Sequence, residues 1–416
     1  MRRMRLRLAA VCLLLASLWP QSLAGYGVLS HEELIDIAWD SNIRHALLLR
    51  FPNATPQELQ QAHAYAYGGS VIQDLGYYPF GDHEFTNMLH YVRTGVFVTN
   101  VLRDARDLNE YAFALGTLSH YVADVWGHPA VNAGVPIEYP KLRAKFGNMV
   151  TYEEHPEAHL KTEFMFDVVQ VAKRRYISQQ YHDFIGFQVS EGLLKRAFQD
   201  TYAVNLDEIL HVDLSIESYR FGVSRVIPEM TQVALASRKQ NLPREKRDEA
   251  RREFLYHLSR TDYERDFGSK YRKPGIFARI LAFLLKLIPK FGSLKSLAYK
   301  DPTPTTEDLY FKSMDKVVAE YHQLLNDVET GELHLPNRNL DTGDPTQPGT
   351  YYLADRTYGG LVRRLGRKHF AGLSVGLRKD LLDFFSSEAA YRGMKDKERR
   401  GTQVMVARLR AYNPEN

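Results

Sequence analysis

The sequence predicts an all-α fold, in which a multi-helix domain is followed by an additional, mostly helical C-terminal region. Apolar residues recur at intervals of three and four, whereas the strict alternation typical of strands is scarce. Residues that begin and end helices also lie between these apolar segments. Both observations favour packed helices over a sheet.

The predicted helices begin and end at recognisable residues. Ser30 and Thr55 are each followed three residues later by a glutamate, which is the pattern of a capping box. A buried helix is predicted over 110–128, ending at Gly127 and Pro129 because proline interrupts helices. Pro156 suits the first turn of the next helix. Further helical patterns cover 85–92, 183–265, 308–328 and 360–385, with a loop rich in Pro, Gly, Asn, Asp and Thr at 336–349.

The first 24 residues have the pattern of a secretory signal peptide. Four arginines precede an apolar run from Leu8 to Trp19, and small residues ending at Ala24 suit cleavage. The only cysteine, Cys12, lies inside this segment, so the exported chain is predicted to have no disulfide. We therefore expect a secreted or periplasmic protein.

The charge balance gives no argument for a nucleic-acid partner. The chain has 54 basic and 50 acidic residues, and the excess equals the four arginines of the predicted signal peptide. A neutral mature protein lacks the basic surface that nucleic-acid binding usually needs. No nucleic acid is expected as a partner, and the oligomeric state is left open.

The predicted helix over 110–128 contains a stripe of polar residues in apolar surroundings. His120, Asp124 and His128 recur every four residues, which places them on one face of a helix. Their neighbours are Phe113, Leu115, Leu118, Tyr121, Val122, Val125 and Trp126. Burying such groups is costly unless a partner satisfies them. Two interpretations of the stripe taken alone are a metal site and a hydrogen-bonded His–Asp pair in a core.

Other potential ligands lie on both sides of this helix. His159 and Glu163 are again four residues apart, and Asp74, His90 and His31 lie upstream. Nine of the fifteen histidines fall between His31 and His159, which favours the metal interpretation. Imidazole and carboxylate ligands without thiolates are typical of a hydrolytic zinc site.

A basic and apolar segment follows the first domain. Residues 266–300 form a basic amphipathic stretch, with the most apolar part at 276–297 interrupted by Pro289. Two interpretations remain open, a segment that binds a membrane surface and a core helix whose lysines reach solvent. The predicted divisions are 1–24 as signal peptide, 25–265 as helical domain, 266–300 as this segment and 301–416 as a C-terminal helical region of unknown role.

The ordered set of motifs resembles the zinc-dependent phospholipase C family, whose site is shared with single-strand-specific zinc nucleases. The motifs are an N-terminal aromatic followed by His31, the pair Asp74 and His90, the run from His120 to Asp124 with His128, and the run from His159 to Glu163. They cover about the first half of the mature chain. The resemblance implies a phospholipase C/nuclease-like helical domain that holds three Zn²⁺ ions.

The resemblance also implies a ligand set for each zinc ion. The first set is Asp74, His90, His120 and Asp124; the second is His128, His159 and Glu163; the third is His31, Asp124 and the N-terminal amine of Gly25. The chain departs from the family pattern in two ways. The family usually begins with tryptophan, whereas here Gly25 precedes Tyr26, which becomes the amine ligand if cleavage follows Gly25. Asp124 and His128 are four residues apart, where six is usual.

The resemblance implies a phosphodiester hydrolase, and a phospholipase C that cleaves glycerophospholipids is the first hypothesis. Asp74 is the candidate catalytic residue that orients or deprotonates the attacking water, although a role as ligand alone is left open. The membrane surface, contacted through 276–297, is the expected partner besides the phospholipid substrate. The alternatives are a zinc-dependent nuclease or nucleotidase on the same site and a non-enzymatic lipid-binding protein.

Overall fold

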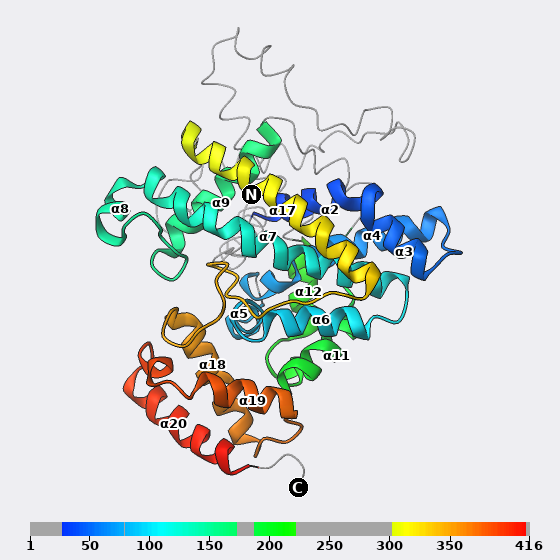
Figure 1. Ribbon diagram of the computed structural model, residues 1–416. Helices are drawn as coiled ribbons and strands as arrows, with labels where there is room; N and C mark the ends of the chain where they lie inside the picture. Colours follow the sequence, from blue (N-terminus) through cyan, green and yellow to red (C-terminus); the bar gives the residue numbers. More distant parts are fainter. Residues whose placement is uncertain (1–26, 79, 173–186, 222–301, 413–416) are drawn as a thin grey trace, which may run out of the picture.

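The computed structural model describes residues 27–78, 80–172, 187–221 and 302–412, and these form helices without any β-strand (Figure 1). The all-α prediction is therefore confirmed. The predicted signal peptide and the segment 276–297 lie outside these ranges. The first part of the chain contains α2 (Val28–Ala38), η1 (Trp39–Ile43), α3 (Arg44–Arg50), α4 (Pro56–Ser70), η2 (Ile72–Tyr77), α5 (His83–Tyr91), α6 (Thr94–Asp104), α7 (Leu108–Glu138), α8 (Pro140–Phe146), α9 (Pro156–Ala172), α11 (Glu191–Tyr202), η3 (Leu206–Glu208) and α12 (Val212–Phe221). The C-terminal part contains α17 (Pro304–Thr330), α18 (Tyr352–Arg367), α19 (Val375–Phe384), η6 (Glu388–Tyr391) and α20 (Asp396–Ala411).

Helix α7 lies at the centre of the molecule and packs against α2, α4, α6, α9 and α17 (Figure 1). Most of its side chains are buried, including those of Phe113, Leu118 and Val122. A helix that is apolar on nearly all sides must be surrounded by other helices. The polar stripe of α7 is therefore enclosed by protein.

Helix α7 is longer than the sequence predicts. It has 31 residues and continues through Pro129 and Pro136, so the predicted end at Gly127 and Pro129 is wrong. Each proline leaves one helical carbonyl without its usual donor. The carbonyl oxygen freed by Pro136 belongs to Asn132 and accepts a bond of 2.9 Å from the backbone N–H of Val150. A tertiary contact thus replaces the bond that the second proline removes.

The crossing of α4 and α7 depends on glycine. A Cβ on Gly69 would lie 2.0 Å from the carbonyl oxygen of Phe113, and one on Gly116 would lie 2.0 Å from that of Ala66. A side chain at either position would force the two helices apart, because backbone atoms cannot move aside easily. The close approach brings Ser70, the last residue of α4, next to His120.

One of the two predicted capping boxes is confirmed. Thr55 and Glu58 exchange the expected hydrogen bonds at the start of α4. The other prediction is wrong, because α2 begins at Val28 and its N-terminal N–H groups are bonded by Asp167 of α9. Ser30 uses its hydroxyl to donate to the same carboxylate. A distant side chain therefore takes the place of the local cap.

The C-terminal helices are in contact with the N-terminal part of the chain. Helix α17 lies across α7 and α2, while α18, α19 and α20 form a group below α5 (Figure 1). The guanidinium of Arg364 bonds the carboxylate of Glu84, with 2.9 Å between Nε and Oε1, and Arg93 Nε lies 2.9 Å from Asp380 Oδ2. The segment predicted as one helix over 360–385 is instead divided between α18 and α19, with Gly372 at φ +73° between them.

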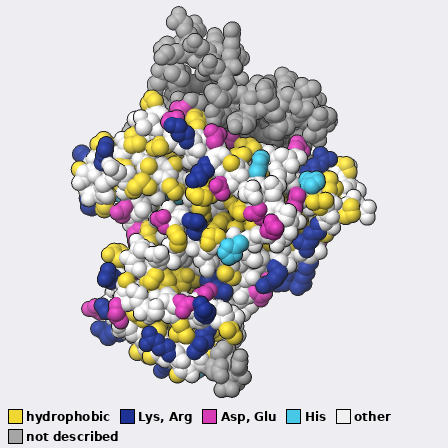
Figure 2. All heavy atoms as spheres, in the orientation of Figure 1, with side chains coloured by type: hydrophobic (Ala, Val, Ile, Leu, Met, Phe, Trp, Pro, Cys, Tyr) yellow, Lys and Arg dark blue, Asp and Glu magenta, His cyan; other side chains and the backbone are white. Residues whose placement is uncertain are grey.

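The described surface combines charges of both signs. Figure 2 shows acidic and basic side chains interspersed over one face, in keeping with the nearly balanced composition. Among the residues that the structure describes, no helix has both the length and the apolar character needed to cross a lipid bilayer.

Candidate metal centre

The predicted ligands come from five elements that converge around the middle of α7. Helix α7 contributes His120, Asp124 and His128. The others are His31 on α2, Asp74 on η2, His90 on α5, and His159 and Glu163 on α9. Gly25 lies outside the described residues. The structure thus brings together every predicted side-chain ligand, although they are spread over more than a hundred residues of sequence.

Asp124 lies between two groups of imidazoles. Its Oδ2 is 3.0 Å from His120 Nε2 and 3.4 Å from His90 Nε2. Its Oδ1 faces the other way, 3.4 Å from His31 Nε2 and 3.8 Å from His128 Nε2. A carboxylate in this position can contact cations on both of its sides.

Three groups of donor atoms are close enough to hold metal ions. Within each group the ligand atoms lie within 4.8 Å of one another, and every residue is buried. The groups are His31, His120 and Asp124; Asp74, His90 and His120; and His128, His159 and Glu163. In the last group, Glu163 Oε1 lies 2.6 Å from His159 Nε2 and 3.6 Å from His128 Nε2.

The hydrogen bonds of the Nδ1 atoms explain why the Nε2 atoms of these histidines face the inside of the cluster. Nδ1 of His90 bonds the carbonyl oxygen of Thr86 at 2.9 Å, and Nδ1 of His120 bonds that of Ser70 at 2.9 Å. Nδ1 of His128 bonds the carbonyl oxygen of Leu340 at 2.7 Å. A carbonyl oxygen only accepts, so Nδ1 holds the proton and Nε2 of the neutral ring keeps its lone pair. Metal-binding histidines are usually oriented in this way.

The burial of these groups supports metal binding. Asp124 and His120 are 0% exposed, and both Asp124 oxygens and the Nε2 atoms of His90 and His128 form no hydrogen bond with any described residue. Buried carboxylates and imidazoles without donors are costly. Nitrogen and oxygen ligands without sulfur suit Zn²⁺ in a site that keeps positions open. The residues present therefore fit the metal that the sequence predicts.

The pKa shifts caused by burial and by neighbouring charges differ between the histidines of the cluster. Burial lowers the pKa of His31, and the neighbouring His120 lowers it further. Burial also acts on His90, but the carboxylates of Asp124 and Asp74 outweigh it and raise its pKa well above the usual value. For His159, burial and then His128 lower the pKa well below the usual value. Neutral imidazole, the form that binds metal, is therefore favoured at His31 and His159.

Sequence reasoning missed residues on the segment after α17. The loop 336–349, predicted only as a connection, places Leu340 and Asp341 beside His128. Asp341 Oδ1 lies 3.7 Å from His128 Nδ1, and the residue is fully buried. No spacing rule relates Asp341 to His128, which lies more than two hundred residues away. The richness of this loop in turn-forming residues gave no signal of such a contact.

Two tyrosines also lie against the predicted ligands. The Tyr77 ring meets the His90 ring edge-on with centroids 6.2 Å apart, and the Tyr152 ring meets His159 at 5.9 Å. The two tyrosine rings are 6.1 Å from each other, and both residues are buried. They form an aromatic border on the side of the centre that faces η2 and the start of α9.

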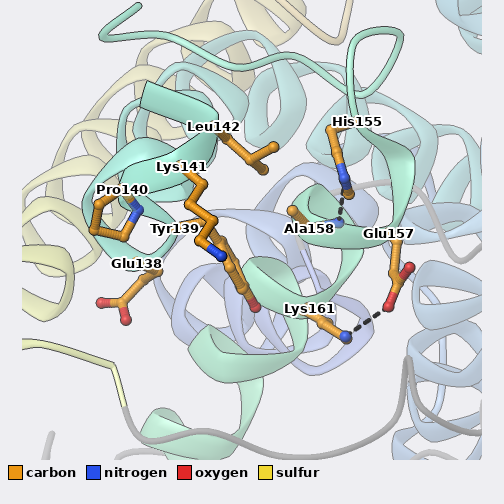
Figure 3. Close-up of a pocket in the computed structure, with 9 residues that line it drawn as sticks. All are labelled: Glu138, Tyr139, Pro140, Lys141, Leu142, His155, Glu157, Ala158 and Lys161. Carbon is orange, nitrogen blue, oxygen red and sulfur yellow. Dashed lines mark hydrogen bonds and ion pairs between the residues drawn. The ribbon is translucent and has the colours of Figure 1, made fainter. Parts of the chain in front are cut away.

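A separate cleft of about 460 Å³ lies between α8 and the start of α9 (Figure 3). His155 and an ion pair of 2.7 Å between Lys161 and Glu157 line it, whereas His159 and Glu163 on the same helix face the metal centre. His155 precedes α9, and its Nδ1 accepts the N–H of Ala158 at the helix start. The nine residues that border this cleft include none of the predicted ligands.

Comparison with known proteins agrees with this geometry. Residues 30–209 match the family model described as zinc dependent phospholipase C. No curated protein and no solved structure matches the chain. The matched segment contains all the predicted side-chain ligands, from His31 to Glu163. Residues 30–209 therefore form a domain of the zinc-dependent phospholipase C family, the domain of a zinc-dependent phosphodiester hydrolase.

Proposed function

We propose that this protein is a secreted phospholipase C that hydrolyses glycerophospholipids between glycerol and phosphate. The products would be diacylglycerol and a phosphorylated headgroup. The observation that supports this proposal is the convergence of buried imidazoles and carboxylates inside the family-matched segment. A phosphodiester is anionic, so a site for its hydrolysis needs concentrated positive charge, which bound metal cations would supply.

The proposed ligand assignment is the one that the family resemblance implies, and it overlaps with the three groups of donor atoms, in which His120 also lies beside His31 and Asp124. Asp74, His90, His120 and Asp124 would hold one Zn²⁺ ion, and His128, His159 and Glu163 a second. His31, Asp124 and the N-terminal amine of Gly25, or of Tyr26, would hold a third. The distances of 3.4 Å or less from Asp124 to His31, His90 and His120 support a shared carboxylate between the first and third ions.

Bound zinc would supply Lewis acidity and lower the pKa of a coordinated water to about 7. Among the chain's own groups, we assign Asp74 the role of orienting the attacking water and accepting its proton. Its Oδ1 lies 3.3 Å from His90 Nε2, and the residue is 3% exposed at the border of the centre. Buried side chains around Asp74 exclude bulk water and strengthen these interactions.

Secretion and membrane attachment complete the proposal. Residues 1–24 would direct export to the periplasm or the exterior, and 276–297 would bind the surface of a phospholipid membrane. Both assignments rest on the sequence, as do the divisions at 265 and 300. Deleting 276–297 would then reduce hydrolysis of vesicles more than that of a soluble short-chain diester.

A hydrolysis assay with a matched pair of variants tests the proposed function. Phosphatidylcholine vesicles, phosphatidylinositol vesicles and single-stranded DNA are incubated with the full chain, with and without chelator. We expect chelator-sensitive release of diacylglycerol, and His120→Asn should abolish it. The control is His63→Asn, because His63 is also buried and is paired at 3.0 Å with Asp36 but belongs to none of the three groups. Hydrolysis of DNA without hydrolysis of lipid would contradict the proposal and identify a nuclease.

A further inference from the structure

The loop between α17 and α18 joins the C-terminal region to the metal centre. It lies outside residues 30–209, the segment that matches the family model. The N–H of Leu340 donates to the carbonyl oxygen of His90 at 3.0 Å, and the carbonyl oxygen of Leu340 accepts from His128 Nδ1 at 2.7 Å. One residue of this loop therefore contacts two helices that present predicted ligands.

Asp341 lies next to this contact and is itself held in place. Its Oδ2 accepts from the hydroxyl of Tyr91 at 2.7 Å and from that of Tyr351 at 2.5 Å. Its backbone carbonyl accepts from Asn132 Nδ2 at 2.7 Å, one turn beyond His128 on α7. These bonds fix both the carboxylate and the backbone of the loop relative to α7.

The other carboxylate oxygen faces His128. Asp341 Oδ1 lies 3.7 Å from His128 Nδ1 and forms no hydrogen bond with the described residues. Asp341 and His128 are both 0% exposed, so solvent does not screen the interaction. A carboxylate beside the N–H side of a ligating imidazole orients the ring and increases the basicity of the other nitrogen.

The backbone of the loop fits α7 where Pro129 interrupts its hydrogen bonds. The carbonyl freed by Pro129 is that of Val125, and a Cβ on Gly343 would lie 2.3 Å from its oxygen. Gly343 also has φ +74°, a left-handed conformation that other residues adopt at a cost. The loop therefore approaches the helix to a distance that only glycine allows.

We propose that Asp341 is a positioning residue for His128, and that the loop segment from Asn339 to Gly343 is a structural part of the zinc centre. The proposal rests on the ligand role of His128 proposed above. Asp341 acts through His128 by holding the ring with Nε2 toward Glu163 and by favouring the form with the proton on Nδ1. The C-terminal region then has a function in metal binding, beyond the segment that the family model covers.

Zinc competition tests this role with the full chain. A chromogenic chelator is titrated against the zinc-loaded protein and the zinc released is measured, so that the readout does not depend on activity. Asp341→Asn should lower the affinity for one of the zinc ions by about 10-fold to 100-fold, which is the usual effect of removing a side-chain partner of a metal ligand. Tyr351→Phe keeps the carboxylate and removes one of its two donors, so it should cause a smaller loss in the same direction. If Asp341→Asn does not fold, Tyr351→Phe provides the decisive measurement.

The matched control is Asp355→Asn. Asp355 is also a 0% exposed carboxylate of the C-terminal region, but it accepts from the N–H of Gly349 at 2.9 Å instead of facing a predicted ligand. This variant should keep the zinc affinity of the wild type. Equal losses in Asp341→Asn and Asp355→Asn would overturn the proposal, because any buried charge change would then have the same effect.

A double-mutant cycle separates this proposal from the assignment of His128 as a zinc ligand, on which the proposal depends. Asp341→Asn should have no further effect on zinc affinity in a His128→Gln background, because its target is already absent. A full additional loss there would assign Asp341 a general structural role and overturn the proposal. Unchanged affinity in Asp341→Asn, with a clear loss in His128→Gln, would also overturn it. Unchanged affinity in His128→Gln would instead remove His128 from the ligands, and the role of Asp341 with it.

Discussion

Replacing Asp167 with asparagine tests how the N-terminus of α2, and with it His31, is fixed beside the metal centre. The carboxylate of Asp167 accepts from the N–H of Leu29 at 3.2 Å, and from the N–H and hydroxyl of Ser30 at 3.1 Å and 3.0 Å. Asp167 is 2% exposed, and burial raises its pKa to about 7 despite these bonds. The folded chain therefore prefers the protonated acid over a range where the unfolded chain is ionised.

The direction of the pH effect follows from this shift. Below the unfolded pKa of 3.8, both states hold the proton and Asp167 causes no penalty. As the pH rises toward 7, the unfolded state loses its proton first, so the free energy of unfolding falls. Between about pH 5 and pH 8.5, the free energy of unfolding of the wild type should fall by roughly 3 kcal/mol because of Asp167. The slope is about 1.4 kcal/mol per pH unit up to the pKa of the folded state.

Asp167→Asn should lack this pH-dependent part. Asparagine keeps an acceptor for Ser30, but its side-chain N–H would face the backbone N–H of Leu29. The free energy of unfolding should therefore be lower than that of the wild type by about 1–3 kcal/mol at low pH. Urea unfolding of both proteins in excess chelator, followed by circular dichroism, measures the difference while metal binding is absent. The two stabilities should converge as the pH rises. Curves that stay parallel from about pH 5 to pH 8.5 would refute the assigned pKa and the reasoning built on it.

The remaining predictions concern the metal centre and the contacts that support it. Asp124→Asn should abolish hydrolysis and release zinc, because its oxygens face four imidazoles; metal analysis that still finds about three zinc per chain would contradict the shared carboxylate. Zinc removal by chelator should lower the melting temperature of the wild type, measured by calorimetry, and this shift should be smaller in Asp124→Asn. Gly116→Ala should lower the free energy of unfolding in urea by about 1–3 kcal/mol and weaken zinc binding. The reason is that the new Cβ would meet the carbonyl oxygen of Ala66 and move α7 away from Ser70. Unchanged stability would exclude the close crossing of α4 and α7.

Local patterns in the sequence were sufficient for several features of the site. The four-residue spacing of His120, Asp124 and His128 required a common face, and the structure has that face inside the protein. The pair His159 and Glu163 obeys the same rule on α9. Such predictions depend only on helix geometry, which is the same in every protein.

Local patterns failed where a distant group replaced a local one. Ser30 has the sequence of a helix cap, but Asp167 bonds the start of α2 instead. Pro129 has the sequence of a helix end, but α7 continues because packing around it outweighs one lost hydrogen bond. In both cases the deciding atoms lie far away along the chain, where no window of sequence includes them.

The sequence by itself determined the helical class, the residue types of the candidate metal centre and the spacing of the predicted ligands within each helix. Only the tertiary structure decided which helices meet, that Asp124 faces imidazoles from three different helices, and that Leu340 and Asp341 contact His128. The physical reason is the range of the interactions. Helix periodicity is set by bonds between residues four apart, whereas the site depends on packing and burial among segments that meet only in the folded chain.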